Sequence, residues 1–291
     1  MTKGRLLRRV IEEVYGPGEA AGFWKRLDVI GDIAFVRVPF GRSPEELRPL
    51  AEAIVERVPY VKSVWAIVSP VEGEYRLRGR FVHLAGERRT ETVYREHGCS
   101  FRVDVARVYV SPRLNYEHER VARLVADGET VVNMYAGAGL FSIVIACMHR
   151  GRVKVYSIDI NPYAYAYMIE NVKMNRVEGS VVPILADAVE AVERLLYDSA
   201  DRVLMPLPEK ALEHLPHALR ALRGGRGWLH VYLHVATPRG VDPRRAGVEA
   251  VVERLRGLGY RAVEAAARVV RTVGPRRSQV VVDVRVEPLR G

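Results

Sequence analysis

A glycine-containing loop is the part of this sequence whose residue types and spacing most clearly suit a nucleoside-like ligand. The loop runs from Asn133 to Phe141 and contains Gly137 and Gly139, which permit a tight turn and a close approach of backbone to ligand. A dinucleotide fingerprint has a third glycine where this chain has Ser142. A bare glycine turn would have the same appearance, so the loop needs support from elsewhere in the chain.

Support comes from the acidic residues that end the next two predicted strands. Asp159 lies twenty residues after Gly139, where a carboxylate accepts hydrogen bonds from ribose hydroxyls. Asp187 ends the following strand, at a position suited to the amino group of an adenine. S-adenosylmethionine carries both groups but no pyrophosphate, so it does not require the missing third glycine. The pattern therefore predicts a site for S-adenosylmethionine.

These residues fall within an alternation of strands and helices in the second half of the chain. Strands are expected at 130–137, 153–160, 181–187 and 201–208, and helices at 140–150, 162–175 and 188–198. Alternation at this spacing implies a parallel sheet with helices on both faces, whose ligands bind at the carboxyl ends of the strands. The glycine loop and both aspartates would share that edge.

The end of the chain refines this α/β class. A strand at 228–236, a helix at 243–258 and the pattern of an antiparallel hairpin between 268 and 287 close the sequence. Such a hairpin is common in methyltransferase sheets and unusual in dinucleotide dehydrogenases. We therefore predict a Rossmann-like class I S-adenosylmethionine methyltransferase domain over residues 116–291.

The first 115 residues have a different rhythm and predict a smaller α+β domain that contacts the substrate. Apolar residues have helical spacing at 5–15, and 28–39 reads as a strand pair turning at Gly31 and Asp32. A helix is expected at 44–58 with Ser43 as its N-cap. Further strands are expected at 63–71, 80–86, 90–98 and 100–111.

Charge points to a polyanionic partner. The net charge is +10, and the segment Arg220–Gly291 holds fifteen arginines against six acidic residues. A basic face raises the encounter rate with polyanions, of which nucleic acid is the commonest. An arginine-rich, solvated surface would fit the composition as well, since arginine outnumbers lysine 39 to 6.

Other classes find little support. No apolar run approaches the ~20 residues of a membrane helix, and the N-terminus has no signal-peptide core, so we expect a cytoplasmic location. Cys99 and Cys147 form no CxxC pair, and His230 and His234 share a face of what looks like a strand. We expect buried thiols, no metal site and a monomer.

Several longer motifs make the predicted function more specific. They are DVIGDIA, EGEYRLR, HLAGE, FRVDVARVYVSPRL, AGAGLFSI, IDINP and RVVRTVGPR. Together they resemble the archaeal Trm5-type tRNA (guanine-37) methyltransferases and their TYW2-like paralogues of wyosine synthesis, from about Asp28 to Val286. The resemblance implies tRNA as the partner and methylation of guanosine-37 at N1, extending to a tricyclic wyosine intermediate. Its alternatives are 3-amino-3-carboxypropyl transfer and tRNA binding without catalysis.

The resemblance also implies residue roles. Arg113 would hold the cofactor from the domain junction, and the cofactor pocket would be lined by Tyr135, Asp159, Ile160 and Asp187. Glu117 would be the general base that removes the guanine N1 proton, and Arg76 or Arg78 would hold guanine O6. N1 is not nucleophilic until its proton leaves, and the charge that then develops on O6 is stabilised by a fixed guanidinium.

The residues themselves leave other readings open. Arg113 and Glu117 are spaced as a helical i, i+4 ion pair, and Arg76 and Arg78 could be surface charges on one strand face. Pro206, on the wall of the cofactor pocket, stands where the family's methyltransferases have an asparagine; proline offers neither a polar side chain nor an N–H. The chain also begins about where the second domain of longer members begins, as the TYW2-like enzymes do.

Overall fold

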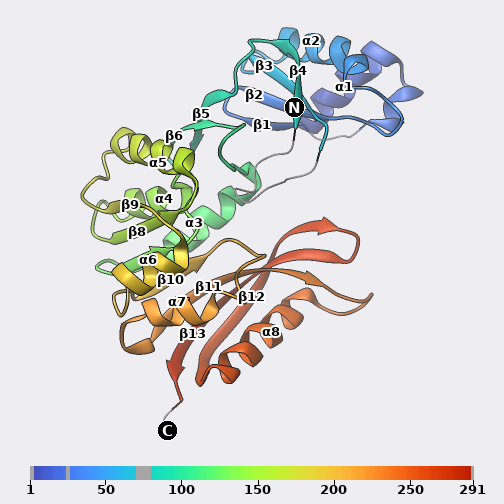
Figure 1. Cartoon of the computed structure of the whole chain (residues 1–291). Helices are drawn as coiled ribbons and strands as arrows, with labels where there is room; N and C mark the ends of the chain where they lie inside the picture. Colours follow the sequence, from blue (N-terminus) through green and yellow to red (C-terminus); the bar gives the residue numbers. More distant parts are fainter. Residues whose placement is uncertain (1–2, 24–26, 70–79, 290–291) are drawn as a thin grey trace. The chain divides into compact units, whose positions relative to one another are not determined.

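The backbone falls into two units, Met1–Pro112 and Arg113–Gly291. The computed structural model describes residues 3–23, 27–69 and 80–289 (Figure 1). Within these ranges, no helix is both long enough and apolar enough to cross a membrane.

The first unit contains a four-stranded sheet, β1-β2-β3-β4, and a separate β5–β6 hairpin. Strands β2 and β3 are parallel and the other pairs antiparallel. Apolar side chains of α1 and α2 pack with those of β2 and β3 to form its core. The elements are α1 (Lys3–Tyr15), η1 (Glu19–Gly22), β1 (Asp28–Ile30), β2 (Ile33–Arg37), η2 (Glu45–Leu47), α2 (Arg48–Arg57), β3 (Ser63–Ile67), β4 (Phe81–Gly86), β5 (Glu91–Glu96) and β6 (Cys99–Asp104).

Two local predictions for this unit were wrong. The helix expected at 44–58 is divided into the 3-10 turn η2 and the helix α2, and the N-cap of η2 is Pro44, without a side-chain cap hydrogen bond, in place of the expected Ser43. The backbone N–H of Ser43 donates to Glu46 Oε1 at 2.7 Å. The strand expected at 100–111 ends at Asp104, because its Oδ1 accepts the Ala106 N–H at 2.9 Å and turns the chain.

The second unit is built on a seven-stranded sheet in the order β12-β13-β11-β10-β7-β8-β9. Strands β11, β10, β7, β8 and β9 are parallel, and β13 and β12 form the antiparallel end. The order reverses between β7 and β10, which is where such sheets bind ligands. The elements are η3 (Pro112–Leu114), α3 (Asn115–Leu124), β7 (Thr130–Asn133), α4 (Leu140–Met148), β8 (Lys154–Asp159), α5 (Pro162–Met174), β9 (Val181–Leu185), α6 (Ala188–Leu195), β10 (Arg202–Met205), α7 (Leu215–Ala221), η4 (Arg223–Gly225), β11 (Gly227–Ala236), α8 (Pro243–Gly257), β12 (Tyr260–Gly274) and β13 (Arg277–Pro288).

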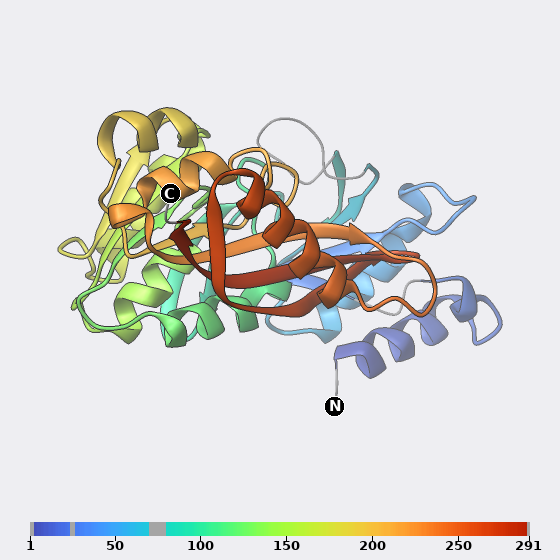
Figure 2. The ribbon, with the colours of Figure 1, turned by 90° about the horizontal axis from the view of Figure 1, so that it is seen from below.

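This architecture confirms the predicted α/β fold with its terminal hairpin. Two helices, α3 and α7, were not predicted, and β12 begins at Tyr260, eight residues before the expected hairpin. Figure 2 shows α8 lying along the long β12–β13 hairpin, against which it packs.

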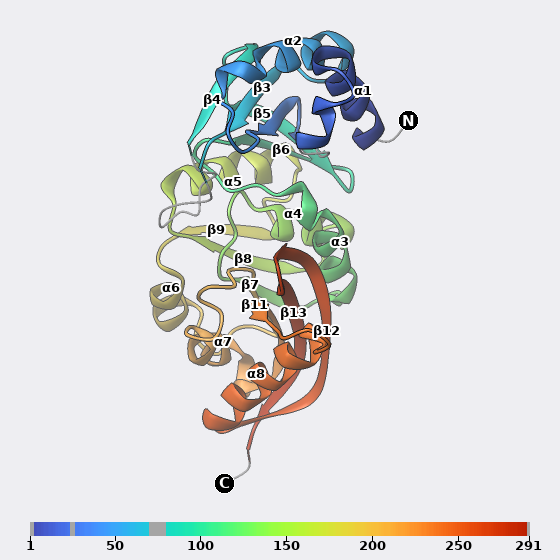
Figure 3. The same ribbon diagram turned by 90° about the vertical axis from the view of Figure 1, so that its right-hand side faces the viewer.

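The two faces of the second sheet differ in polarity. Helices α6, α7 and α8 (Figure 3) share an apolar core with one face of the sheet. This core includes Val203, Val231 and Val282. Side chains alternate between faces along a strand, so the neighbouring residues Arg202, His230 and Asp283 share the opposite face. Helix α3 supplies Arg120 as a partner of Asp283 and the Leu124 carbonyl oxygen as a partner of Arg202. The face under α6, α7 and α8 is therefore apolar, whereas the opposite face carries a row of polar groups among buried apolar residues such as Leu204 and Val281.

Gly31 makes the turn between β1 and β2 in a crowded position. Its φ is +57°, and a Cβ there would overlap Thr92 Oγ1 and lie 2.7 Å from the Val93 carbonyl oxygen. The next residue, Asp32, accepts hydrogen bonds from Arg89 Nη1 at 2.9 Å, Arg89 Nη2 at 2.6 Å and the Thr92 hydroxyl at 2.7 Å. The Arg89 hydrogen bond holds the pKa of Asp32 below its usual value. This turn thus ties the sheet to the hairpin.

We expect Gly31→Ala to lower the free energy of unfolding of this unit by about 3 kcal/mol or more. The left-handed backbone costs a side chain about 1–2 kcal/mol, and overpacking adds about 1–3 kcal/mol. Gly98→Ala is the matched control, since its φ is +76° and no atom of the described residues lies within 4 Å of its added Cβ. Urea denaturation should show the smaller loss for Gly98→Ala; equal losses would contradict the crowding.

Candidate active site

The loop after β7 is shaped by its two glycines and anchored by buried polar groups. Gly137 and Gly139 have φ values of +57° and +90°, and a Cβ on Gly139 would meet Met168 Cγ at 3.0 Å. Buried Asn133 donates through Nδ2 to Ser142 Oγ at 3.1 Å. The residue that replaces the third glycine of a dinucleotide fingerprint therefore fastens the start of α4 to the strand.

Asp159 binds this loop directly. At the end of β8 its Oδ2 accepts the Gly137 N–H at 2.6 Å, and its Oδ1 accepts the Asn161 N–H at 2.9 Å. Burial raises the pKa of Asp159, against the lowering effect of the two N–H donors. A carboxylate has about four lone-pair positions, so two remain for ribose hydroxyls. The predicted pairing of glycine loop and acid is present in the geometry.

Asp187 and Tyr135 lie at the same edge of the sheet. Asp187 Oδ1 caps α6 by accepting the N–H groups of Val189 at 2.8 Å and Glu190 at 3.1 Å. The hydroxyl of Tyr135 lies 2.6 Å from His214 Nδ1. Burial, followed by the charges of Asp187 and Glu213, raises the pKa of Tyr135, so its hydroxyl keeps the proton.

The other predicted residues vary in accessibility. Ile160, directly after Asp159, is 42% exposed. Pro206 is half-buried and follows β10, and Arg113 is exposed within η3. Arg76 and Arg78 lie outside the described residues. In the described part of the chain, no three His, Cys, Asp or Glu side chains gather closely enough to hold a metal ion.

Glu117 is buried, with 1% of its surface exposed, on the face of α3 that meets the sheet. Its Oε2 accepts hydrogen bonds from Arg120 Nε at 3.1 Å and the Tyr232 hydroxyl at 3.0 Å. Its Oε1 lies 3.0 Å from Arg268 Nη1. Tyr232 directly follows Val231, which pairs with the last residue of β10, Met205. The carboxylate therefore lies near the strand end that Pro206 follows.

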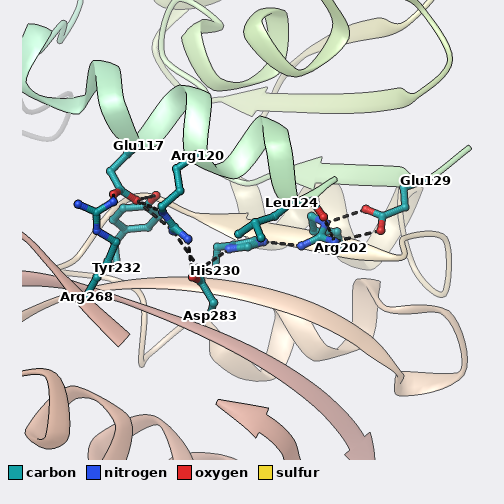
Figure 4. Close-up of polar contacts among 9 residues, drawn as sticks. All are labelled: Glu117, Arg120, Leu124, Glu129, Arg202, His230, Tyr232, Arg268 and Asp283. Atoms are coloured by element: carbon teal, nitrogen blue, oxygen red, sulfur yellow. Dashed lines mark hydrogen bonds and ion pairs between the residues drawn. The ribbon is translucent and has the colours of Figure 1, made fainter. Parts of the chain in front are cut away.

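Sequence reasoning did not find the partners of Glu117. Arg120, Tyr232 and Arg268 come from α3, β11 and β12, and their side chains meet only because the sheet pairs those strands (Figure 4). His230 was considered only as a metal ligand; it is fully buried and contacts Asp283 and Arg202. The one signal available in the sequence was an arginine three residues after Glu117.

A protein-family model described as the TRM5/TYW2 methyltransferase domain matches residues 92–268, which is more than half of the chain. The chain belongs to this family. The predicted family and the methyltransferase fold are thereby confirmed.

Relatives of this TRM5/TYW2 chain cover most of its length. The tRNA 4-demethylwyosine(37)-methyltransferase Taw21 of Saccharolobus solfataricus is 43% identical over 262 residues, 90% of this chain and 94% of that protein. Trm5b of Pyrococcus abyssi, a tRNA (guanine(37)-N(1))-methyltransferase, is 40% identical over 89% of this chain and 74% of its own length. A Methanocaldococcus jannaschii tRNA(Phe) (4-demethylwyosine(37)-C(7)) aminocarboxypropyltransferase is 33% identical over 89% and 96%.

Solved structures agree with this placement in the TRM5/TYW2 family. The crystal structure of P. abyssi Trm5b has a TM-score of 0.78 and 39% identity, covering 93% of this chain and 78% of that one. The structure of M. jannaschii TYW2 in complex with AdoMet, S-adenosylmethionine, has a TM-score of 0.68 and 28% identity, covering 91% and 100%.

We expect Asp159→Asn to weaken S-adenosylmethionine binding about 10- to 100-fold. Hydrogen bonds to a charged group contribute about 1.5–3 kcal/mol, and 1.4 kcal/mol is one decade. Because burial raises the pKa of Asp159, lowering the pH from 7.5 should weaken binding to the wild type at a higher pH than an ordinary carboxyl group would, by protonating this acceptor. That component should be absent from Asp159→Asn.

Isothermal titration calorimetry would measure these affinities. Asp242→Asn is the matched control, because Asp242 accepts the Arg244 N–H as the N-cap of α8. This variant should bind the cofactor with wild-type affinity. Unchanged affinity in Asp159→Asn would remove this residue from the pocket.

Proposed function

We propose that this chain transfers a methyl group from S-adenosylmethionine to the base at position 37 of tRNA. The observation that carries the proposal is the hydrogen bond from the Gly137 N–H to Asp159 at the carboxyl ends of the strands. It occurs in a chain whose relatives, matched over about nine-tenths of its length, are enzymes that modify position 37 of tRNA. The related TYW2 structure, which holds AdoMet, supports the cofactor. A cytoplasmic location and an archaeal source are part of the proposal.

The strand ends supply the proposed cofactor pocket. Asp159 accepts from the ribose hydroxyls and Asp187 from the adenine amino group. Gly137 and Gly139 let the backbone approach the ligand. The remaining wall is formed by Tyr135, Ile160 and Pro206, with Arg113 reaching the cofactor from η3. Bound here, S-adenosylmethionine supplies an electrophilic methyl group on a cationic sulfur.

Glu117 is the proposed general base. As the nucleophilic atom of the base forms its bond to the methyl carbon, the carbon–sulfur bond breaks and its electron pair returns to sulfur. The proton on the nucleophilic atom passes to the carboxylate of Glu117. Arg76 or Arg78 is proposed to stabilise the charge on the base oxygen. Burial of Glu117 excludes competing water from the proton acceptor.

We infer 4-demethylwyosine-37 as the preferred base. The S. solfataricus methyltransferase for that base is 43% identical to this chain, whereas P. abyssi Trm5b is 40% identical. Pro206 supports the same choice, since it can neither donate nor accept a side-chain hydrogen bond to guanine. Guanosine-37 is the second candidate, because Trm5b is 40% identical and methylates it at N1.

Methyl transfer is favoured over aminocarboxypropyl transfer by the relatives. The M. jannaschii aminocarboxypropyltransferase covers this chain as fully as the methyltransferases do, but its identity is 33% against 43%. Both groups come from the same cofactor, so the pocket itself is compatible with either.

Mass analysis of position 37 tests the reaction. The protein would be incubated with S-adenosylmethionine and, in parallel, with tRNA carrying guanosine or 4-demethylwyosine at position 37. We expect a gain of one methyl group, about 14 Da, on 4-demethylwyosine and a slower or absent gain on guanosine. A gain of about 101 Da would instead identify aminocarboxypropyl transfer, and no product beside an active control enzyme would leave only a tRNA-binding role.

We expect Glu117→Gln to lower the single-turnover rate of methyl transfer about 100-fold or more and to leave the dissociation constant of S-adenosylmethionine within about twofold. Loss of a positioned base typically costs 10²–10⁴-fold, and the carboxylate makes no proposed contact with the cofactor. Glu119→Gln is the control, because Glu119 lies on another face of α3 than Glu117 and is partly exposed. A wild-type rate in Glu117→Gln would exclude the base role.

A further inference from the structure

A row of buried and half-buried charged and polar side chains runs between α3 and the sheet (Figure 4). It begins at Glu117 and Arg120, passes through Asp283 and His230, and ends at Arg202, whose Nε donates to Glu129 at 2.7 Å. His230 and Asp283 are register partners on β11 and β13. Side chains of paired residues lie on the same face, so the register places this row under α3.

The hydrogen bonds fix the protonation state of His230. Arg202 Nη1 lies 2.8 Å from His230 Nε2, and a guanidinium can only donate. Nε2 must therefore accept, which leaves the proton on Nδ1, and Nδ1 donates to Asp283 Oδ1 at 2.5 Å. Burial lowers the pKa of His230, in agreement with the neutral ring that this geometry requires. From Arg202 through His230, donation thus runs towards Asp283.

Asp283 receives donors from both sides. Arg120 forms a two-pronged pair with it, Nη1 to Oδ2 at 2.5 Å and Nη2 to Oδ1 at 3.1 Å. Burial raises the pKa of Asp283, but the His230 and Arg120 contacts outweigh it and bring the pKa to about 2. Asp283 is therefore an anion at neutral pH, and its two oxygens set the plane of the Arg120 guanidinium.

The orientation of Arg120 decides which oxygen of Glu117 is occupied. With Nη1 and Nη2 on Asp283, Nε points to Glu117 Oε2, which also accepts from Tyr232. Glu117 Oε1 is buried, and no donor among the described residues meets it with hydrogen-bond geometry. Its neighbour is Arg268, an ion-pair partner that also lies 4.3 Å above the Tyr116 ring. Oε1 is thus the oxygen of Glu117 that accepts no hydrogen bond from the described residues, although it is paired with Arg268 Nη1 at 3.0 Å.

We propose that Asp283, held by His230, is a positioning residue for the proposed base: through Arg120 it keeps Glu117 Oε2 occupied and turns Oε1 towards the substrate proton. This inference rests on the proposed role of Glu117. It makes the terminal hairpin, which carries Asp283, part of the proton-transfer apparatus, although no residue of β13 need touch the substrate.

A double-mutant cycle on single-turnover methyl transfer tests it. Asp283→Asn should lower the rate about tenfold while S-adenosylmethionine affinity stays within twofold. In a Glu117→Gln background the same substitution should cost less than twofold, because its effect passes through Glu117. A tenfold loss in both backgrounds would mean that Asp283 acts independently of Glu117, and would overturn the proposal.

A second variant, Arg120→Lys, distinguishes a loss of positioning from a folding defect in Asp283→Asn. Lysine keeps the charge but lacks the fork that binds Asp283 while reaching Glu117, so the same loss and the same dependence on Glu117 are expected. Asp127→Asn is the matched control. Asp127 accepts from His149 and Arg152, each at 2.7 Å, in a similar triad at the surface, and its variant should keep the wild-type rate within twofold.

A second readout does not depend on activity. The Arg120 Nε–H resonance, identified by its loss in Arg120→Lys, should exchange with water at least tenfold faster in Asp283→Asn than in the wild type or Asp127→Asn. Unchanged exchange would overturn the positioning role. An inactive wild-type protein with accelerated exchange in Asp283→Asn would refute the proposed function and retain the structural coupling.

Discussion

The pairing of Arg120 with Asp283 is the interaction on which the second unit depends. It joins α3, the first helix of the unit, to β13, its last strand, through two hydrogen bonds between largely buried charges. Removing one member of a buried pair leaves the other charge desolvated, at a cost of about 3–5 kcal/mol. An apolar contact would tolerate sliding of the helix over the sheet. A two-pronged ion pair does not, because the donors and acceptors match in one register only.

The apolar core and the row of polar groups make different contributions: the core stabilises the fold, and the polar row orients side chains. The apolar face under α6, α7 and α8 contributes burial, which is nearly independent of direction. The opposite face holds charged groups whose hydrogen bonds depend strongly on geometry. Such a row is a poor source of stability but a good source of orientation, since each member restricts the next. Orientation is what a general base needs.

Hydrogen bonds also fix the orientation of the glycine loop at the carboxyl ends of the strands, where the cofactor is proposed to bind. Asp159 is tied to the backbone N–H of Gly137, so the acid proposed to bind ribose is also the group that shapes the loop. Ser142 and Asn133 hold the start of α4 against β7. Loop and acid are therefore arranged before a ligand arrives, which reduces the ordering cost of binding.

The sequence alone determined the order of strands and helices, the α/β class and the acids at the strand ends, because period, turn residues and strand-end positions are local properties of the chain. It placed Asp159 and Gly137 at one edge through a general rule for parallel sheets. It missed the short helices α3 and α7 and the partners of Glu117. Tyr232, Arg268 and Asp283 lie more than 100 residues from Glu117, and only strand register brings them to one face. Tertiary structure decided these contacts, because contacts between side chains on different strands depend on strand pairing and register, which no local sequence pattern encodes.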